Sequence, residues 1–143
     1  MTENAKNKQN LKELVETKNF VEHLSIDCVI FGFHKDKLKV LLLKYHDLDL
    51  WCVPGGFIFN DENLNDAAAR TLYERTHLSN VYLEQFYTFG DVRRTENNVH
   101  QKLLENKNIA VEKNHWIDQR YISVGYFALA DYTFTYTFPD SFN

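Results

Sequence analysis

The sequence predicts a single domain of the α/β class, and three observations lead to this prediction. The chain has 143 residues, which is the length of one ordinary domain. Aromatic residues make up 15% of it, an excess that favours strands. Apolar runs with the character of strands lie on both sides of a segment with helical spacing, residues 64–76.

Two apolar runs near the N-terminus predict a β-hairpin. Residues 24–33 and 38–45 are rich in aliphatic and aromatic side chains, and four polar residues separate them. Asp27 lies within the first run, where a carboxylate must face water at a sheet edge or find a partner in a functional site. The preceding residues, 1–22, form a polar and partly helical leader, so we expect the folded domain to cover 23–143.

A glycine-rich turn and a helix come next. A short third run, 50–53, leads into the Pro-Gly-Gly turn 54–56, whose glycines permit backbone conformations that other residues adopt only at a steric cost. Segment 64–76 places apolar residues four positions apart, as one buried face of a helix requires. We expect Asn63 to cap this helix and Asp66 to suit its first turn. The spaced apolar residues are Leu64, Ala68 and Leu72.

The C-terminal half predicts two further strands, at 80–89 and 119–131. The polar segment 91–118 between them is long for a loop without structure of its own. Helical spacing within 99–107 predicts a short helix there. The tail, 132–143, alternates in the manner of another strand.

The composition excludes several classes of function. A formal net charge of −4 provides no general attraction for a nucleic-acid backbone. No apolar run approaches the roughly 18 residues of a membrane span, and the polar N-terminus does not resemble a signal peptide. We therefore expect a cytoplasmic protein without a membrane partner. Cys28 and Cys52 have neither metal-site nor redox spacing, so we expect buried free thiols.

The turn and the helix carry a spaced motif. A glycine is followed, after five intervening residues, by a glutamate, and after seven more by an arginine, an aliphatic residue and a second glutamate. This spacing resembles the Nudix box, Gx5Ex7REUxEExGU, in which U is aliphatic. Thr71 and Arg75 stand where the box has glutamates, and His77 stands where it has glycine. The matching residues are Gly56, Glu62, Arg70, Leu72, Glu74 and Leu78.

The differences from the box bear on metal binding. In Nudix hydrolases three glutamates form the metal-binding face of the helix. Their positions here hold Thr71, Glu74 and Arg75, which share one helix face at i, i+3 and i+4. Arg75 brings a permanent positive charge to that face. The resemblance therefore implies a Nudix fold, a mixed β-sheet sandwiched by helices, without catalytic residues and without a cofactor.

The retained box residues have a structural interpretation and a catalytic one. In the first, Gly56 serves the turn, and Glu62 pairs with Arg70 to brace the loop against the helix. In the alternative, the chain is a Mg²⁺-dependent hydrolase of nucleoside diphosphate derivatives. Glu62 and Glu74 would then be catalytic, Glu74 and Gly55 would hold the metal, and the bound Mg²⁺ would polarise the diphosphate and activate water.

Other segments narrow the resemblance. It is carried by IDCVIFGF, KVLLLKY, WCVPGGF, NVYLEQFYTFGDVRR and RYISVGYFAL. These segments resemble the Nudix domain that precedes a winged helix in bacterial transcriptional regulators of the NAD-repressor and arabinose-responsive types. The similarity covers about 24–129, with an insertion at about 95–117. The winged helix, the last strand and the C-terminal helix have no counterpart, so we expect a domain truncated at its C-terminus.

The regulator resemblance implies an effector-binding domain whose ligand is a sugar or an ADP-ribose-like molecule. It also implies a homodimer, and a chain that does not bind DNA directly on its own. We expect ligand contacts from Phe57 by stacking, and from Arg75, Arg93, Arg94 and Arg120, because guanidinium groups hold phosphates and sugar hydroxyls with paired donors. The plain alternatives are a core aromatic and solvated arginines. A third possibility is a dimerisation module with a vestigial pocket.

Overall fold

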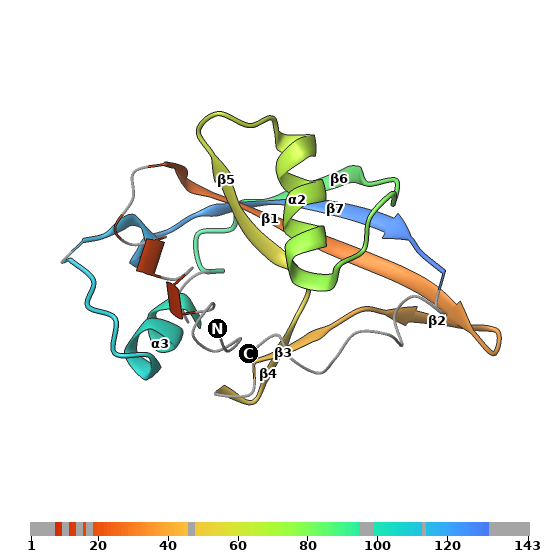
Figure 1. Cartoon of the computed structure of the whole chain (residues 1–143), viewed down its shortest axis with the longest axis horizontal. Helices are drawn as coiled ribbons and strands as arrows, with labels where there is room; N and C mark the ends of the chain where they lie inside the picture. The colour runs from red at the N-terminus through yellow and green to blue at the C-terminus, as the bar shows by residue number, and fades with distance from the viewer. Residues whose placement is uncertain are drawn as a thin grey trace.

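The computed structural model of the chain is built on a mixed five-stranded sheet, with helix α2 packed across one face (Figure 1). A separate two-stranded sheet lies beside it. The expected α/β architecture is therefore confirmed. The residues that the structure describes are 8–9, 12–13, 16, 19–45, 48–94, 99–112 and 114–131.

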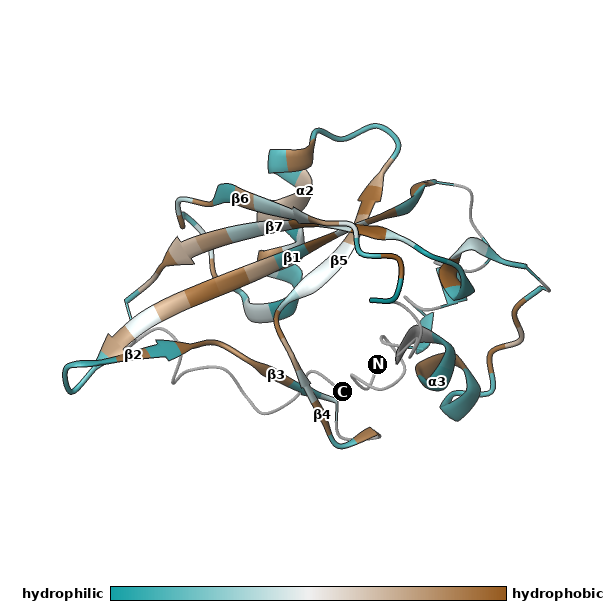
Figure 2. Cartoon of the chain, turned by 180° about the vertical axis from the view of Figure 1, so that it is seen from behind, coloured by the Kyte–Doolittle hydropathy of each residue, from teal (hydrophilic) through white to brown (hydrophobic). Residues whose placement is uncertain are grey.

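Strand β1 (Phe20–His34) is the centre of the large sheet. One of its edges pairs in parallel with β7 (Ile122–Leu129). The other edge pairs antiparallel with β2 (Lys37–Val40) and with β5 (Gly55–Phe59). Figure 2 shows β1 as a mostly hydrophobic strand, as expected for a strand with neighbours on both edges. It begins at Phe20, three residues before the expected start of the domain.

The predicted hairpin is confirmed near its turn and wrong beyond it. The run 38–45 is two strands rather than one, because β2 ends at Val40 and β3 (Leu43–Tyr45) pairs with β4 (Leu50–Cys52). The reason is competition for the edge of β1. The N–H of Cys28 donates to the Pro54 carbonyl at 2.8 Å, so the approach to β5 occupies the edge that a longer β2 would need.

Helix α2 (Leu64–Thr76) has the predicted bounds. Asn63 stands at the N-cap position, but its side chain makes no cap hydrogen bond and instead donates to Asp66 at 3.1 Å, so the predicted side-chain cap is wrong. The helix buries its alanine-rich face on the sheet. The first core cluster consists of Ile26, Cys28, Ile30, Ile58, Ala67, Ala68, Leu72, Leu78, Val124, Tyr126 and Ala128.

The later elements agree with the sequence in kind and differ in length. The strand β6 (Glu84–Phe89) is shorter than the predicted 80–89 and pairs with β7 at the edge of the sheet. The predicted short helix is confirmed as α3 (Val99–Asn106), and a 3₁₀ turn, η2 (Trp116–Asp118), follows it. The tail, 132–143, whose alternation resembles a strand, lies outside the described residues.

A second core cluster covers part of the sheet face opposite α2. Side chains alternate along a strand, so Phe57 points away from the face that buries its neighbour Ile58 under α2. Phe57 packs there with Leu104 of α3 and with Trp116 and Ile117 of η2. The segment between β6 and β7 thus closes one end of this second face.

Among the described residues, no helix is long and apolar enough to cross a membrane.

Candidate functional site

Glu62 and Arg70 brace the loop that joins β5 to α2. Two guanidinium nitrogens of Arg70 donate to the Glu62 carboxylate, at 2.5 and 3.0 Å, and Glu62 also accepts the N–H of Phe59 at 2.8 Å. Arg70 further donates to the Phe57 carbonyl at 2.7 Å. The hydrogen bond from Arg70 is the main reason why the pKa of Glu62 lies below its ordinary value. The predicted structural pairing of Glu62 with Arg70 is confirmed.

Arg70 also neutralises the remaining glutamate of the box face. Its third nitrogen donates to Glu74 at 3.0 Å, one helical turn away, so one guanidinium serves two carboxylates. Gly56 is needed for the contact of β5 with α2, because a Cβ on it would lie 2.9 Å from the Thr71 side chain. Thr71 is buried, and its hydroxyl has no hydrogen-bond partner within the described part of the chain.

Arg75 reaches from α2 to the start of β5. Its Nε donates to the main-chain oxygen of Gly55 at 3.2 Å. Since Gly55 has no side chain, this oxygen is the ligand that it could offer to a metal. Glu62 and Glu74 are meanwhile engaged by Arg70. Among the described residues, no group of three or more His, Cys, Asp or Glu side chains is placed to hold a metal ion.

Asp27 lies in the middle of the sheet and not at an edge. Its cross-strand partner on β5 is Gly55, and its partner on β7 is Gly125. Burial raises the pKa of the Asp27 carboxyl, while a hydrogen bond from Ser123 and the charge of Arg94 act in the opposite direction. A partly buried carboxylate at the centre of a sheet is a candidate site residue. Of the two alternatives drawn from the sequence, this position favours a partner in a functional site over a sheet edge that faces water.

Two of the four predicted arginines border this region. Arg75 contacts Gly55, and a guanidinium nitrogen of Arg94 lies 3.9 Å from an Asp27 oxygen. Arg94 is held over the ring of Tyr121, 5.8 Å from the ring centroid, and donates to the Tyr121 carbonyl at 3.4 Å. The structure therefore brings Asp27, Arg75 and Arg94 towards the same end of β5.

The other two predicted arginines serve the turn before α3. The Arg93 side chain is 80% exposed and lies 3.8 Å from Asp91. Arg120 donates to the Gly90 carbonyl at 2.7 Å, which ties the start of β7 to the end of β6. These contacts account for both side chains structurally, and neither contact involves Asp27 or Gly55.

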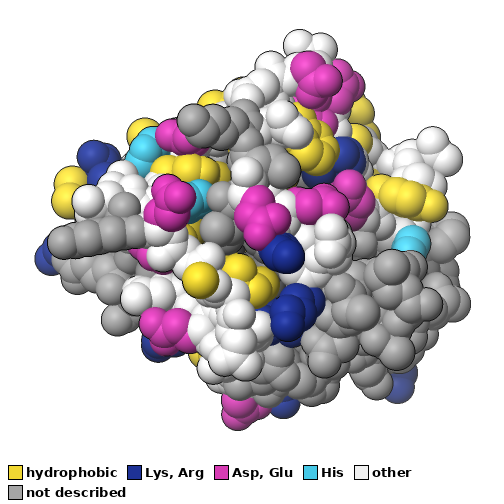
Figure 3. All heavy atoms as spheres, turned by 60° about the vertical axis from the view of Figure 1, so that its left-hand side comes forward, with side chains coloured by type: hydrophobic (Ala, Val, Ile, Leu, Met, Phe, Trp, Pro, Cys, Tyr) yellow, Lys and Arg dark blue, Asp and Glu magenta, His cyan; other side chains and the backbone are white. Residues whose placement is uncertain are grey.

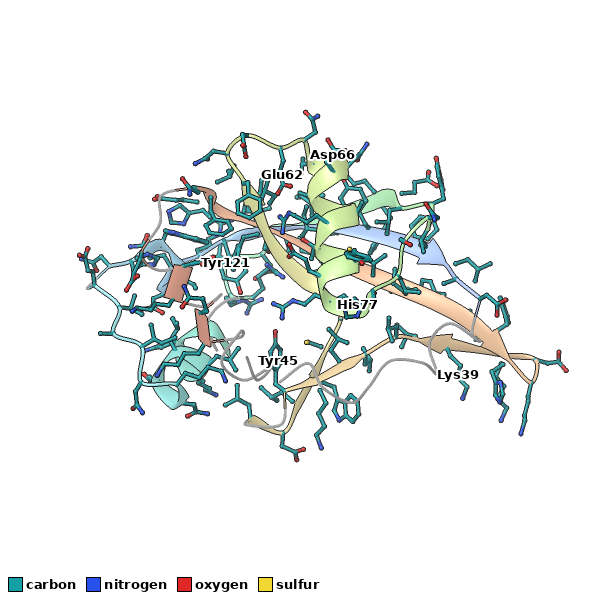
Figure 4. The ribbon with its side chains drawn as sticks, viewed as in Figure 1. Lys39, Tyr45, Glu62, Asp66, His77 and Tyr121 are labelled. Atoms are coloured by element: carbon teal, nitrogen blue, oxygen red, sulfur yellow. The ribbon has the colours of Figure 1, made fainter. Side chains whose placement is uncertain are left out.

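The sequence did not predict Tyr45 and Cys52 as residues of the candidate site. Burial raises the pKa of both groups, and a hydrogen bond joins the phenol to the thiol. The charge of Arg75 lowers the pKa of both groups and the charge of Asp27 raises it, so Tyr45 and Cys52 lie near these two residues. Figure 4 shows Tyr45 below the His77 end of α2. No spacing rule links these residues, because they come from a separate small sheet.

Phe57 is a core residue and not an exposed stacking surface. Its ring is 7% exposed and makes an edge contact with Trp116 at a centroid distance of 4.9 Å. These contacts match the core interpretation of Phe57, and ligand stacking by Phe57 stays a prediction. The ring is buried because η2, far away in the sequence, folds over it.

Figure 3 shows acidic and basic side chains lying beside one another on one face of the molecule, next to hydrophobic ones.

The sequence matches the NUDIX domain over residues 21–140, which is most of the chain. The chain belongs to the Nudix family. Glu62 and Arg70 thus connect the loop and the helix of the Nudix box in this protein. The predicted family is confirmed.

The proteins that this Nudix chain resembles include transcriptional regulators as well as other Nudix proteins. It is 34% identical over 76 residues to the ADPR responsive transcriptional repressor NtrR of Acinetobacter baylyi, which covers 50% of this chain and 30% of the repressor. It resembles the crystal structure of Shewanella oneidensis NrtR with a TM-score of 0.59 and 30% identity, covering 85% of this chain and 50% of that one.

A third similarity concerns a ligand complex. The structure of the NUDIX domain of Shewanella oneidensis NrtR with ADP ribose matches with a TM-score of 0.54 and 29% identity, over 92% of this chain and 73% of that chain. The Nudix chain spans half the length of the full regulator structure and less than a third of the curated repressor. The predicted resemblance to Nudix regulators is confirmed.

Proposed function

We propose that this Nudix chain binds an ADP-ribose-like nucleotide sugar as an effector and does not hydrolyse it. Two relatives support the ligand class, one named for its response to ADPR and one crystallised with ADP ribose. The chain's own residues support the absence of turnover. The repressor and the full regulator structure are longer than this chain, so transcriptional repression is not part of this proposal.

The single observation that carries the proposal is the contact between Arg75 and Gly55. The Arg75 guanidinium donates to the main-chain oxygen that a Nudix metal centre would use, at 3.2 Å. An arginine side chain keeps its proton throughout the physiological pH range, so a fixed positive charge stands where a dication would be attracted. Metal binding is disfavoured there by charge repulsion and by occupation of the ligand.

The same arginine favours an anionic ligand. A guanidinium group offers several donors in a planar fork, and this geometry suits phosphate oxygens. Arg75 uses Nε for Gly55, which leaves its terminal nitrogens for other acceptors. We propose that a diphosphate binds beside Arg75, with the arginine supplying the charge that Mg²⁺ supplies in a hydrolase. No cofactor is then needed for binding.

The decisive experiment is calorimetric titration of the chain with ADP-ribose, in Mg²⁺ and in EDTA. We expect the same affinity in both buffers and no release of AMP on prolonged incubation. Arg75→Gln should weaken binding about tenfold or more, because it removes a charge-assisted contact to phosphate. Arg75→Lys should recover part of the loss, because the charge returns without the planar fork.

Lys39→Gln is the control for the loss of one positive charge. Lys39 is exposed on β2, and Figure 4 shows it well away from Tyr45 and Tyr121. Its affinity for ADP-ribose should match that of the unmodified chain. Hydrolysis of ADP-ribose that requires Mg²⁺ and is abolished by Glu74→Gln would overturn the proposal in favour of a hydrolase. The homodimer remains a prediction. Analytical ultracentrifugation of the chain measures its oligomeric state.

A further inference from the structure

The Asp27 carboxylate is recessed between two glycines. A Cβ on Gly55 would lie 2.7 Å from Asp27 Oδ1, so any other residue at position 55 would press on the carboxylate. On the opposite side, a Cβ on Gly125 would meet the Phe86 and Phe89 rings at 2.9 to 3.0 Å. Both cross-strand neighbours of Asp27 therefore lack side chains, and on the β7 side the Phe86 and Phe89 rings occupy the space over Gly125.

A pair of buried hydroxyls orients this carboxylate. The hydroxyl of Ser123 hydrogen bonds to Asp27, and the hydroxyls of Ser25 and Ser123 bond to each other. Since an ionised carboxylate can only accept, Ser123 donates to Asp27 and Ser25 donates to Ser123. Both serines are buried, so the carboxylate is held by groups that do not move with solvent.

The carboxylate still has acceptor capacity. It carries about four lone-pair sites, of which, among the residues that the structure describes, the Ser123 hydroxyl uses one. The nearest Arg94 nitrogen is 3.9 Å away, beyond hydrogen-bond distance, and the Asp27 side chain is 33% exposed. A partly buried carboxylate with open acceptor sites lowers stability, so Asp27 is a candidate acceptor for a ligand that donates hydrogen bonds.

The neighbouring charges decide which donors fit. A guanidinium nitrogen of Arg94 lies 3.9 Å from Asp27, and Arg75 donates to the main-chain oxygen of Gly55, the residue opposite Asp27 on β5, so two guanidinium groups lie in this region. Two positive charges disfavour a metal ion or an amine. Neutral hydroxyl groups remain, and a carboxylate is a suitable acceptor for ribose hydroxyls. Phosphates attached to the same sugar would meet the arginines.

We propose that Asp27 is the sugar-reading residue of the site, accepting hydrogen bonds from vicinal hydroxyls of a ribose in the bound effector. This inference rests on the proposed binding of a nucleotide sugar and assigns the group that selects its sugar. A site built to bond a hydroxyl rejects an analogue that lacks it, because the acceptor is then left buried and unpaired.

The test is a cycle of one substitution against one ligand hydroxyl. The unmodified chain and Asp27→Asn are titrated with ADP-ribose and with two analogues, each lacking the 2-hydroxyl of one of its riboses. We expect one analogue to bind the unmodified chain about tenfold more weakly than ADP-ribose. Asp27→Asn should bind ADP-ribose about tenfold more weakly than the unmodified chain does. Its affinities for ADP-ribose and for that analogue should differ by less than about twofold.

Asp36→Asn, in the exposed turn between β1 and β2, is the matched control and should keep the full discrimination. Thermal melting verifies that all three chains are folded. Equal weakening of every ligand by Asp27→Asn, or unchanged discrimination, overturns the inference, since a merely structural role affects the three ligands alike. These results leave the proposed function standing, because binding of ADP-ribose itself is measured separately.

A failure of the unmodified chain to bind ADP-ribose would instead contradict the proposed function. The same cycle is then run with ribose 5-phosphate and 2-deoxyribose 5-phosphate. A preference for ribose 5-phosphate that disappears in Asp27→Asn supports sugar reading by Asp27 without ADP-ribose. Absence of such a preference overturns it.

Discussion

The backbone N–H of His77 donates to the carbonyl oxygen of Tyr73 at 2.7 Å, and this bond closes helix α2. His77 makes it from the left-handed region, with φ of 58°. The rings of His77 and Tyr73 also meet edge to face, 5.6 Å apart. The Nudix box has glycine here, and a residue with a Cβ has roughly 1–2 kcal/mol of strain in this conformation.

His77→Gly should therefore stabilise the chain. The relief of backbone strain is offset in part by the larger entropy of glycine in the unfolded chain and by loss of the contact with the Tyr73 ring. We expect a net gain of about 0.5–1 kcal/mol and a rise in Tm of about 1–4 °C. His77→Ala is the control, since alanine keeps the Cβ and should not stabilise. A Tm that falls in His77→Gly contradicts this account of the helix end.

Two buried threonines of α2 should respond to the same substitution in opposite directions. Thr71 has an unpaired hydroxyl among the described residues, so Thr71→Val should raise the free energy of unfolding by about 1 kcal/mol. Thr76 donates to the Leu72 carbonyl at 2.7 Å and accepts from the Leu78 N–H at 3.1 Å, so Thr76→Val should lower it by about 1–3 kcal/mol. Urea denaturation measures both changes, and equal effects would show that hydrogen bonding does not govern them.

The brace between Glu62 and Arg70 makes stability depend on pH. The pKa of Glu62 is lowered, chiefly by its hydrogen bond from Arg70, so the folded chain holds this proton less tightly than the unfolded one. The contribution is fully present above the ordinary glutamate pKa and is lost as the pH falls through the lowered value. Glu62→Gln should cost about 1–3 kcal/mol at pH 7 and nothing further in acid.

Glu74→Gln provides the comparison for that measurement. Glu74 bonds the same arginine, but its side chain is 56% exposed, so the change should stay within about 0.5 kcal/mol. Denaturant melts of both variants from pH 7 to pH 3 separate the two carboxylates. An equal loss in both variants is incompatible with the partly buried brace.

Asp27 should show the opposite dependence on pH. Its pKa is raised by burial, so the folded chain holds the proton more tightly, and the charged form reduces stability once the pH exceeds the raised value. Asp27→Asn should therefore raise Tm at neutral pH, and this gain should disappear below the ordinary aspartate pKa. Asp36→Asn, which is exposed, should show no such trend. A constant difference across the pH range would exclude burial of the charge as the cause.

Local patterns in the sequence were sufficient for the elements whose contacts are near in sequence. Helix α2 follows from apolar spacing, and the pairing of Glu62 with Arg70 follows from the motif. The break between β2 and β3 does not, because it depends on the Pro54 carbonyl reaching β1. Gly125 inside the apolar strand ISVGYFAL is the local signal of close backbone approach at this position.

The order of residues specified the family, the helix and the loss of the metal ligands, since these depend on residue type at short, regular separations. Folding decided which side chains meet at the site. Asp27, Gly55 and Gly125 come from three strands, and Arg94 reaches them from the turn after a fourth, β6. Strand register places Asp27 opposite Gly55 and Gly125, and the packing of η2 buries Phe57. Both depend on contacts between residues that are remote in the chain, which no local pattern encodes.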